Sequence, residues 1–244
     1  MGFIRPLVLL PFVTVAALLP RATLIAQSGP TVYTSDNSDW WSYTRIPDGD
    51  DAAVMQDREP SGSNFQILGI KLGYGMLDVA ASSLGKTSIV HRGDAATARS
   101  QACYSSKEPR GEIYLVLEEG EVNSALYMFS GGPHWKGSDL CTQTNLVAKD
   151  LSTASGLHLG QTIAQVKDVL GMPSILASNK LIYSLSVQKK TSAADFEKAK
   201  RSYPELNQDQ LHSNYDFYTL FVHIEARFLN GYLAYLAISK SETY

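Results

Sequence analysis

A short stretch, 80-AASSLGKTS-88, carries the residue types of a phosphate-binding loop. Gly85, Lys86 and Thr87 follow a small residue and four spacers, and such loops bind phosphate through backbone N–H groups, a lysine and a hydroxyl. That chemistry needs a strand before the glycine and a helix after it, so that helix N–H groups face the phosphate. Residues before Gly85 are predicted to be helical instead. Gly85 would therefore end a helix, and a nucleotide site is disfavoured.

Histidine and carboxylate side chains are the other candidates for catalysis. His223, Glu225 and Arg227 alternate along one predicted strand and so share a face. A solvated Glu225–Arg227 pair is the favoured interpretation, and a hydrolase site around His223 is the alternative. The chain has no G-x-S-x-G or H-E-x-x-H motif. We predict a protein that is not an enzyme, with no catalytic residue, no metal ligand and no cofactor.

The two cysteines, Cys103 and Cys141, are predicted to form a disulfide, because export into an oxidising compartment favours such a bond. Closing a loop of that length would stabilise the fold by roughly 4 kcal/mol. Two free buried thiols, or half of a metal site, are the alternatives.

Residues 1–26 have the order of a secretory signal. Arg5 precedes an uncharged apolar run from Pro6 to Pro20, and Ala26 is a small residue at the expected cut. The run is about 15 residues, shorter than the roughly 20 that span a bilayer. A permanent N-terminal anchor is the alternative. We expect export to the periplasm or the extracellular space.

Composition limits the classes of partner. Without residues 1–26 the chain keeps 19 basic against 24 acidic residues, a formal charge of −5. A mildly acidic surface without a basic cluster disfavours nucleic acid, and the later hydrophobic runs are too short for a transmembrane helix. The predicted partner is another protein.

The chain contains an internal repeat, which defines its structural unit. Segment 69-GIKLGYGMLDVAASSLGKTSIV-90 aligns with 156-GLHLGQTIAQVKDVLGMPSIL-176. In the second copy Ile163, Val166, Val169 and Leu170 fall on one helical face, and Gly171 with Pro173 would end that helix. Each copy continues into a short strand and a long hairpin.

The two hairpins are predicted from alternating apolar runs. The first spans 112–129 and turns at Glu119-Gly120, and the second spans 218–238 and turns at Asn230-Gly231, a strong hairpin signal. If the turns are two residues long, the residues expected to face the helices are Ile113, Leu115, Leu117, Val122, Val222, Ile224, Ala226, Phe228, Leu233 and Tyr235. Those expected to face away include Glu112, Tyr114, Val116, Ala125, Tyr127, Phe221, His223, Glu225, Arg227, Leu236 and Ile238.

The repeated pattern resembles a known family. Gly-Leu-x-Leu-Gly, a helix ending in Leu-Gly-x-Pro-Ser, a Tyr-containing strand and a hairpin turning on Gly look like the module of BamE-type (SmpA/OmlA) outer-membrane assembly lipoproteins. The layout is also similar to the tandem modules of secreted β-lactamase inhibitor proteins. The resemblance implies helices packed on one face of a small antiparallel sheet, and partner binding without a cofactor. The chain lacks the lipidated cysteine of the BamE type, and it matches no contact residue of the inhibitors by motif.

These observations predict an α+β fold of two tandem modules, each a short helical segment packed on a small antiparallel sheet. The predicted divisions are a signal peptide (1–26), a polar extension (27–65), a first module (66–147) and a second module (150–244). A helical insertion near 191–212 distinguishes the second copy, with Ser192 as its cap and Pro204 as its end. It is either a tolerated loop or a partner contact.

Each outward sheet face is unusually apolar, so it meets another protein or is covered by the N-terminal extension of this chain. Aromatic side chains are the predicted contacts, because they anchor interfaces. The candidate binding residues are Trp40, Trp41, Tyr114, Tyr127, Trp135 and Phe221. Trp40 and Trp41 would insert into an apolar groove of this chain or of a partner. We expect an exported, non-catalytic protein-binding module, with a secreted inhibitor of a hydrolase as the alternative.

Overall fold

The computed structural model describes residues 32–34, 59–94, 98–107, 113–130, 140–177 and 179–244. These residues form an α+β fold, which confirms the predicted fold class. The helical elements are η2 (Gly62–Phe65), α2 (Met76–Leu84), α3 (Ile163–Leu170), α4 (Ala193–Ser202) and α5 (Gln208–Tyr215). None of the helices in these ranges is long and apolar enough to cross a membrane.

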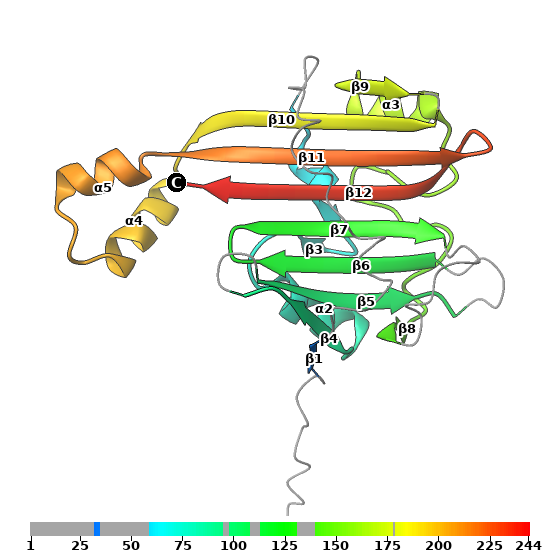
Figure 1. Ribbon diagram of the computed structural model, residues 1–244, viewed down its shortest axis with the longest axis horizontal. Helices are drawn as coiled ribbons and strands as arrows, with labels where there is room; N and C mark the ends of the chain where they lie inside the picture. The colour runs from blue at the N-terminus through cyan, green and yellow to red at the C-terminus, as the bar shows by residue number, and fades with distance from the viewer. Residues whose placement is uncertain (1–31, 35–58, 95–97, 108–112, 131–139, 178) are drawn as a thin grey trace, which may run out of the picture.

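One large sheet runs through the molecule in the order β1-β4-β5-β6-β7-β12-β11-β10-β9, with β8 paired to β5 (Figure 1). Its strands are β1 (Val32–Thr34), β4 (Ile89–Arg92), β5 (Arg99–Ser105), β6 (Ile113–Gly120), β7 (Asn123–Ser130), β8 (Thr142–Gln143), β9 (Ile175–Ala177), β10 (Lys180–Lys190), β11 (Phe217–Leu229) and β12 (Tyr232–Thr243). A separate two-stranded sheet joins β2 (Gln66–Ile67) to β3 (Ile70–Lys71).

The two hairpins are joined edge to edge. β7 pairs antiparallel with β12, from Phe129 opposite Tyr235 to Asn123 opposite Ser241. The strands of both halves therefore belong to one continuous sheet, and not to two small sheets. The boundaries predicted for two separate modules stay a prediction.

The helix ends of the repeat are equivalent in detail. Gly85 follows α2 with φ +101°, and Gly171 follows α3 with φ +84°, a region that favours glycine. The Tyr104 hydroxyl donates a hydrogen bond to the Gly85 carbonyl at 3.0 Å, and the Tyr183 hydroxyl donates to the Gly171 carbonyl at 3.0 Å. Gly85 thus ends a helix, as predicted, and its carbonyl faces a tyrosine of β5.

The main core lies between the sheet and the helices α2 and α3, on a side of the sheet that we call the helix face. Val166 and Leu170 are buried there, with Ile163 and Val169 packed beside them, which confirms the predicted apolar face of this helix. The predicted inward residues of β6 and β11 also join this core: Ile113, Leu115, Leu117, Val222, Ile224, Ala226 and Phe228.

Strand β12 differs from the predicted alternation. Leu233 lies opposite Phe228 and Tyr235 lies opposite Arg227, so Ala234 is an extra residue in β12. Such a bulge exchanges the faces of every residue beyond it. Leu236 and Ile238 consequently lie in the main core, and Tyr235 lies on the opposite side, which we call the second face. The predicted faces of these three residues were wrong.

The second hairpin turn lies where it was predicted, and the first lies two residues further along the chain. Asn230 and Gly231 form the second turn with φ of +53° and +83°, as the Asn-Gly signal predicts. The first turn lies at Glu121-Val122, between the end of β6 and the start of β7, and not at Glu119-Gly120. Val122 is half-exposed in that turn, so its predicted place facing the helix was wrong.

The insertion contains two helices, which lie beyond one end of the sheet, beside the C-terminus (Figure 1). Ser192 caps α4 by accepting the N–H of Asp195, and α4 ends at Ser202, before Tyr203 and Pro204, as predicted. Asn207 caps α5 in the same way through the N–H of Gln210.

Candidate functional site

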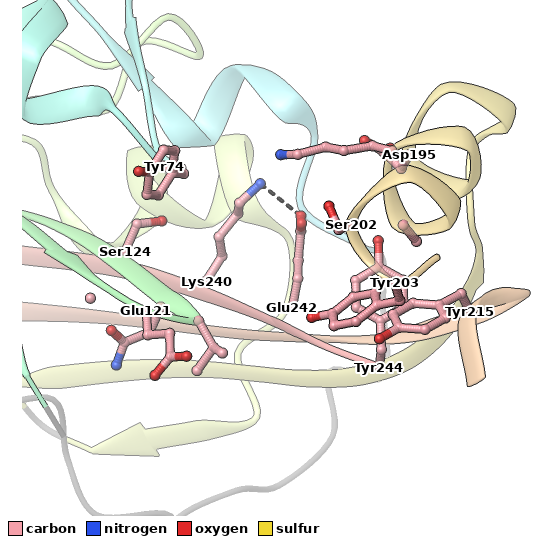
Figure 2. Close-up of a pocket in the computed structure, with 16 residues that line it drawn as sticks. Tyr74, Glu121, Ser124, Asp195, Ser202, Tyr203, Tyr215, Lys240, Glu242 and Tyr244 are labelled. Carbon is pink, nitrogen blue, oxygen red and sulfur yellow. Dashed lines mark hydrogen bonds and ion pairs between the residues drawn. The ribbon is translucent and has the colours of Figure 1, made fainter. Parts of the chain in front are cut away.

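A cleft of about 400 Å³ opens where the insertion meets the body of the protein. Figure 2 shows Tyr74 on one side of this cleft and Asp195 on the other, with the Lys240–Glu242 ion pair between them. The Lys240 Nζ to Glu242 Oε1 distance is 2.9 Å. The β6–β7 turn, at Glu121, completes the lining.

Tyr74 is the most exposed large hydrophobic side chain in the described residues, at 93%. It lies between Gly73 and Gly75, whose φ angles of +152° and +79° are ones that L side chains rarely adopt. These two glycines form the tight turn that leads into α2. The tyrosine ring is therefore presented at a turn and not from within a helix or strand.

The carboxylate of Glu119 fixes this turn. It accepts the N–H of Gly75 at 2.7 Å and the N–H of Leu77 at 3.2 Å. Gly75 has no side chain that could cap α2, so a residue of β6 satisfies the free N–H groups of the first turn. Glu119 follows Leu117 by two residues and projects from the helix face of the sheet.

A second cavity of about 450 Å³ adjoins the first. Both cavities are lined by Tyr74, Gly120 and Glu121. The two hollows therefore meet at Tyr74, and we call them together the Tyr74 groove. In the second cavity the Oγ of Ser100 lies 2.7 Å from Nδ1 of His91, an arrangement of hydroxyl and imidazole that also occurs in nucleophile–base pairs.

Tyrosine rings attach the insertion to the sheet. The Tyr203 and Tyr215 ring centroids are 5.4 Å apart, Tyr215 and Tyr244 are 5.2 Å apart, and Tyr218 and Tyr244 are 5.9 Å apart. Burial and the nearby carboxylates of Asp195 and Glu242 raise the pKa of the Tyr244 phenol above its usual value.

One face of α4 forms a wall of the cleft. Asp195, Lys198, Ala199 and Ser202 line it at helical spacing. No residue of α4 is buried, so the protein does not use this face as core. The wall is mostly polar, and Asp195 lies across the cleft from Tyr74 (Figure 2).

The second face of the sheet holds two buried carboxylates, each tied to its own partners. Glu118 accepts a hydrogen bond from Gln101 Nε2 and lies 3.6 Å from Arg99. Burial raises the pKa of Glu118, and the Gln101 hydrogen bond and the Arg99 charge only partly oppose this effect. Glu225 accepts a hydrogen bond from Arg227 Nε at 2.6 Å.

The sequence predicted a solvated Glu225–Arg227 pair beside His223. The pair exists, but Glu225 is only 1% exposed while Arg227 is half-exposed, so the prediction was wrong for Glu225. His223 Nδ1 lies 3.1 Å from the Ser184 hydroxyl. The strand register places Glu118 and His223 in one row across the sheet, through Ala125 and Ser239.

The predicted contact residues are not brought together at the Tyr74 groove. Tyr114 and Tyr127 are buried on the second face, and their role as contacts stays a prediction. Phe221 is 46% exposed, on the second face. The predictions for Trp40, Trp41 and Trp135 fall outside the described residues, as does any cover that residues 35–58 provide.

The predicted disulfide between Cys103 and Cys141 is present. It links β5 to the residue before β8, next to the second-face cluster. Tyr74 and the tyrosines of the insertion were missed by sequence reasoning. The Gly-Tyr-Gly triplet at 73–75 is the local signal that could have marked Tyr74.

Within the described ranges no group of three or more His, Cys, Asp or Glu side chains could hold a metal ion. No protein-family model, no curated protein and no solved structure matches this chain.

Proposed function

We propose that this protein is an exported, non-catalytic protein-binding module of the cell envelope or extracellular space, and that Tyr74 is its principal contact. The single observation that carries the proposal is the 93% exposure of Tyr74 on a turn that Glu119 holds at two backbone N–H groups. Tyrosine is enriched among the few residues that dominate protein interfaces.

A turn that is already fixed favours binding, because binding restricts mobile side chains and loops. This loss of freedom costs about 0.5–1.5 kcal/mol for each mobile side chain. The backbone that carries Tyr74 is already held by the two hydrogen bonds that the N–H groups of Gly75 and Leu77 donate to Glu119. The cavities on either side of the ring can receive partner side chains while the ring enters a pocket of the partner. This arrangement favours recognition of a macromolecule.

The predicted signal at 1–26 and the resemblance to BamE-type modules and secreted inhibitors support the same proposal. A secreted inhibitor would also bind a protein, and the identity of its target would distinguish it from an assembly factor. If the retained partner is a hydrolase, the change in its activity on addition of this protein decides between the two.

Comparative affinity capture tests the proposal. The full-length expressed protein, its Tyr74→Ala variant and a Tyr232→Ala variant are immobilised and exposed to envelope and culture extracts of the source. Tyr232 is the matched control, because it is an exposed tyrosine of the second hairpin, outside the groove. We expect a protein that wild type and Tyr232→Ala retain and Tyr74→Ala loses. Equal retention by all three would refute the proposal.

A hydrolase is the second candidate, and the Ser100–His91 pair in the second cavity is the observation that favours it. Serine attack needs an adjacent base, which His91 would supply. Hydrolysis of a panel of ester and amide substrates that disappears in both Ser100→Ala and His91→Ala would establish this function in place of the first.

A further inference from the structure

The charged side chains that line the Tyr74 groove are mostly acidic. Among the described residues its two cavities are lined by the carboxylates of Asp78, Glu119, Glu121, Asp195 and Glu242, and by the ammonium groups of only Lys198 and Lys240. Lys240 is already paired with Glu242, and Glu119 is occupied by α2. The groups left to a partner are the carboxylates of Asp78 and Glu121 and the Oδ1 of Asp195, against the single ammonium of Lys198. The Oδ2 of Asp195 accepts a hydrogen bond from the Ser192 hydroxyl.

The groove also presents aromatic rings to its contents. Tyr74 lies where the cavities meet, and Tyr203, Tyr215 and Tyr244 line the end next to the insertion. The raised pKa of Tyr244 has the carboxylates of Asp195 and Glu242 among its causes. A cation over a tyrosine face is attracted by the negative face of the ring, and nearby carboxylates add to that attraction.

The shape of the groove suits an extended segment. Its two cavities adjoin at the β6–β7 turn, with α2 and its Tyr74 turn on one side and α4 on the other. An extended chain points successive side chains in opposite directions, so alternate residues can enter the two cavities while the others face solvent.

We propose that the Tyr74 groove receives an extended segment of the protein partner that carries alternating lysine or arginine side chains. The inference rests on the proposed function and adds the chemistry of the partner. Asp78, Glu121 and Asp195 attract the basic groups, the tyrosines pack against their stems and charged ends, and α4 limits which segment fits.

Fluorescence anisotropy tests the inference with a labelled nonapeptide of alternating lysine and serine, and with a matched peptide that has glutamate for lysine. We expect the lysine peptide alone to bind the full-length protein. Its affinity should fall as salt rises from 20 to 200 mM, roughly the range over which surface charges become screened. A double Glu121→Lys, Asp195→Lys variant should bind it about 10-fold or more weakly, since each rim charge contributes up to roughly 1 kcal/mol.

Asp150→Lys is the matched control, because Asp150 is an exposed carboxylate between β8 and α3 that lines neither cavity. It should leave the affinity within about two-fold, since an exposed charge away from the contact is largely screened by salt. Equal binding of the two peptides, no binding of the lysine peptide, or an equal loss in the control variant would overturn the inference. Thermal unfolding of each variant establishes that it is folded.

The two proposals fail in different ways. If Tyr74→Ala loses the captured partner while the double charge variant keeps it, the partner is a protein but its contact is not basic, and only the inference falls. If Tyr74→Ala keeps the partner, the proposed function falls, whatever the peptides do.

Discussion

The carboxylate of Glu119 on β6 holds the backbone N–H of Gly75 at 2.7 Å, at the N-terminus of α2. Through this contact a strand of the sheet sets the position of the turn that displays Tyr74. The residue whose side chain caps the helix thus lies 44 residues further along the chain. The turn that carries the exposed tyrosine is held by this contact with the sheet.

Removing that carboxylate should lower the stability of the protein. We expect Glu119→Ala to lower the free energy of unfolding by about 1 kcal/mol, as loss of a helix N-cap does, and Glu119→Gln to have a smaller effect. Urea denaturation measures the free energy of unfolding of both variants. Glu121→Ala, in the exposed turn, is the control and should unfold like wild type. Equal stability of Glu119→Ala and Glu121→Ala would contradict the capping role.

The equivalent tyrosines of the repeat should contribute alike. Tyr104→Phe and Tyr183→Phe each remove a hydroxyl that donates to a helix-terminal glycine carbonyl, so each should cost about 0.5–1.5 kcal/mol. The exposed Tyr232→Phe is the control and should change stability by less than about 0.5 kcal/mol. A loss at only one of the two positions, measured by denaturant unfolding, would show that the two contacts are not equivalent.

The disulfide should contribute strongly to stability. Cys103 and Cys141 are separated by 38 positions, and closing such a loop is worth roughly 4 kcal/mol in the chain-entropy model. A double Cys103→Ala, Cys141→Ala variant should therefore unfold at a clearly lower urea concentration than oxidised wild type. Reduced wild type should behave like the variant. Two titratable thiols in the native protein would contradict the bond itself.

Glu118 should make stability depend on pH in a defined direction. A buried carboxyl with a raised pKa keeps its proton more readily when folded than when unfolded. The stability that Glu118 contributes is therefore fully present below the pKa that its carboxyl has in the unfolded chain. This contribution is lost as pH rises through the pKa of the carboxyl in the folded protein. Glu118→Gln cannot titrate, so we expect its melting temperature to rise relative to wild type as pH increases.

The melting temperature of Glu118→Gln at neutral pH should rise by about 2–4 °C for each kcal/mol of stability that the substitution recovers in a chain of this size. Scanning calorimetry from the acid to the neutral range measures it, with the exposed Glu121→Gln as control. A difference between Glu118→Gln and wild type that stays constant over that range would be inconsistent with the raised pKa.

Local signals predicted much of the fold. Helix caps, the glycine after α3 and the Asn-Gly turn depend on neighbouring residues, and the structure has them where the sequence indicates. The bulge at Ala234 has no such marker, because apolar residues occupy both sides of it in the sequence. An error of one residue there reversed the predicted faces of Tyr235, Leu236 and Ile238.

The candidate site was largely beyond sequence reasoning because long-range pairing creates it. The cleft depends on the β7–β12 junction and on the length of β11 and β12, which bring Glu242 and Tyr244 to the insertion. Burial of Tyr114 and Tyr127 also depends on the tertiary fold, since alternation assigns them to a face without saying whether that face is open.

Titration calorimetry of the captured partner with wild type and Tyr74→Ala is the most direct test of the central claim. Interface anchors contribute 2 kcal/mol or more, so Tyr74→Ala should bind about 30-fold more weakly or worse, with unchanged thermal stability, while Tyr232→Ala should bind like wild type. Equal dissociation constants for all three proteins would contradict the claim that this protein binds its partner through Tyr74.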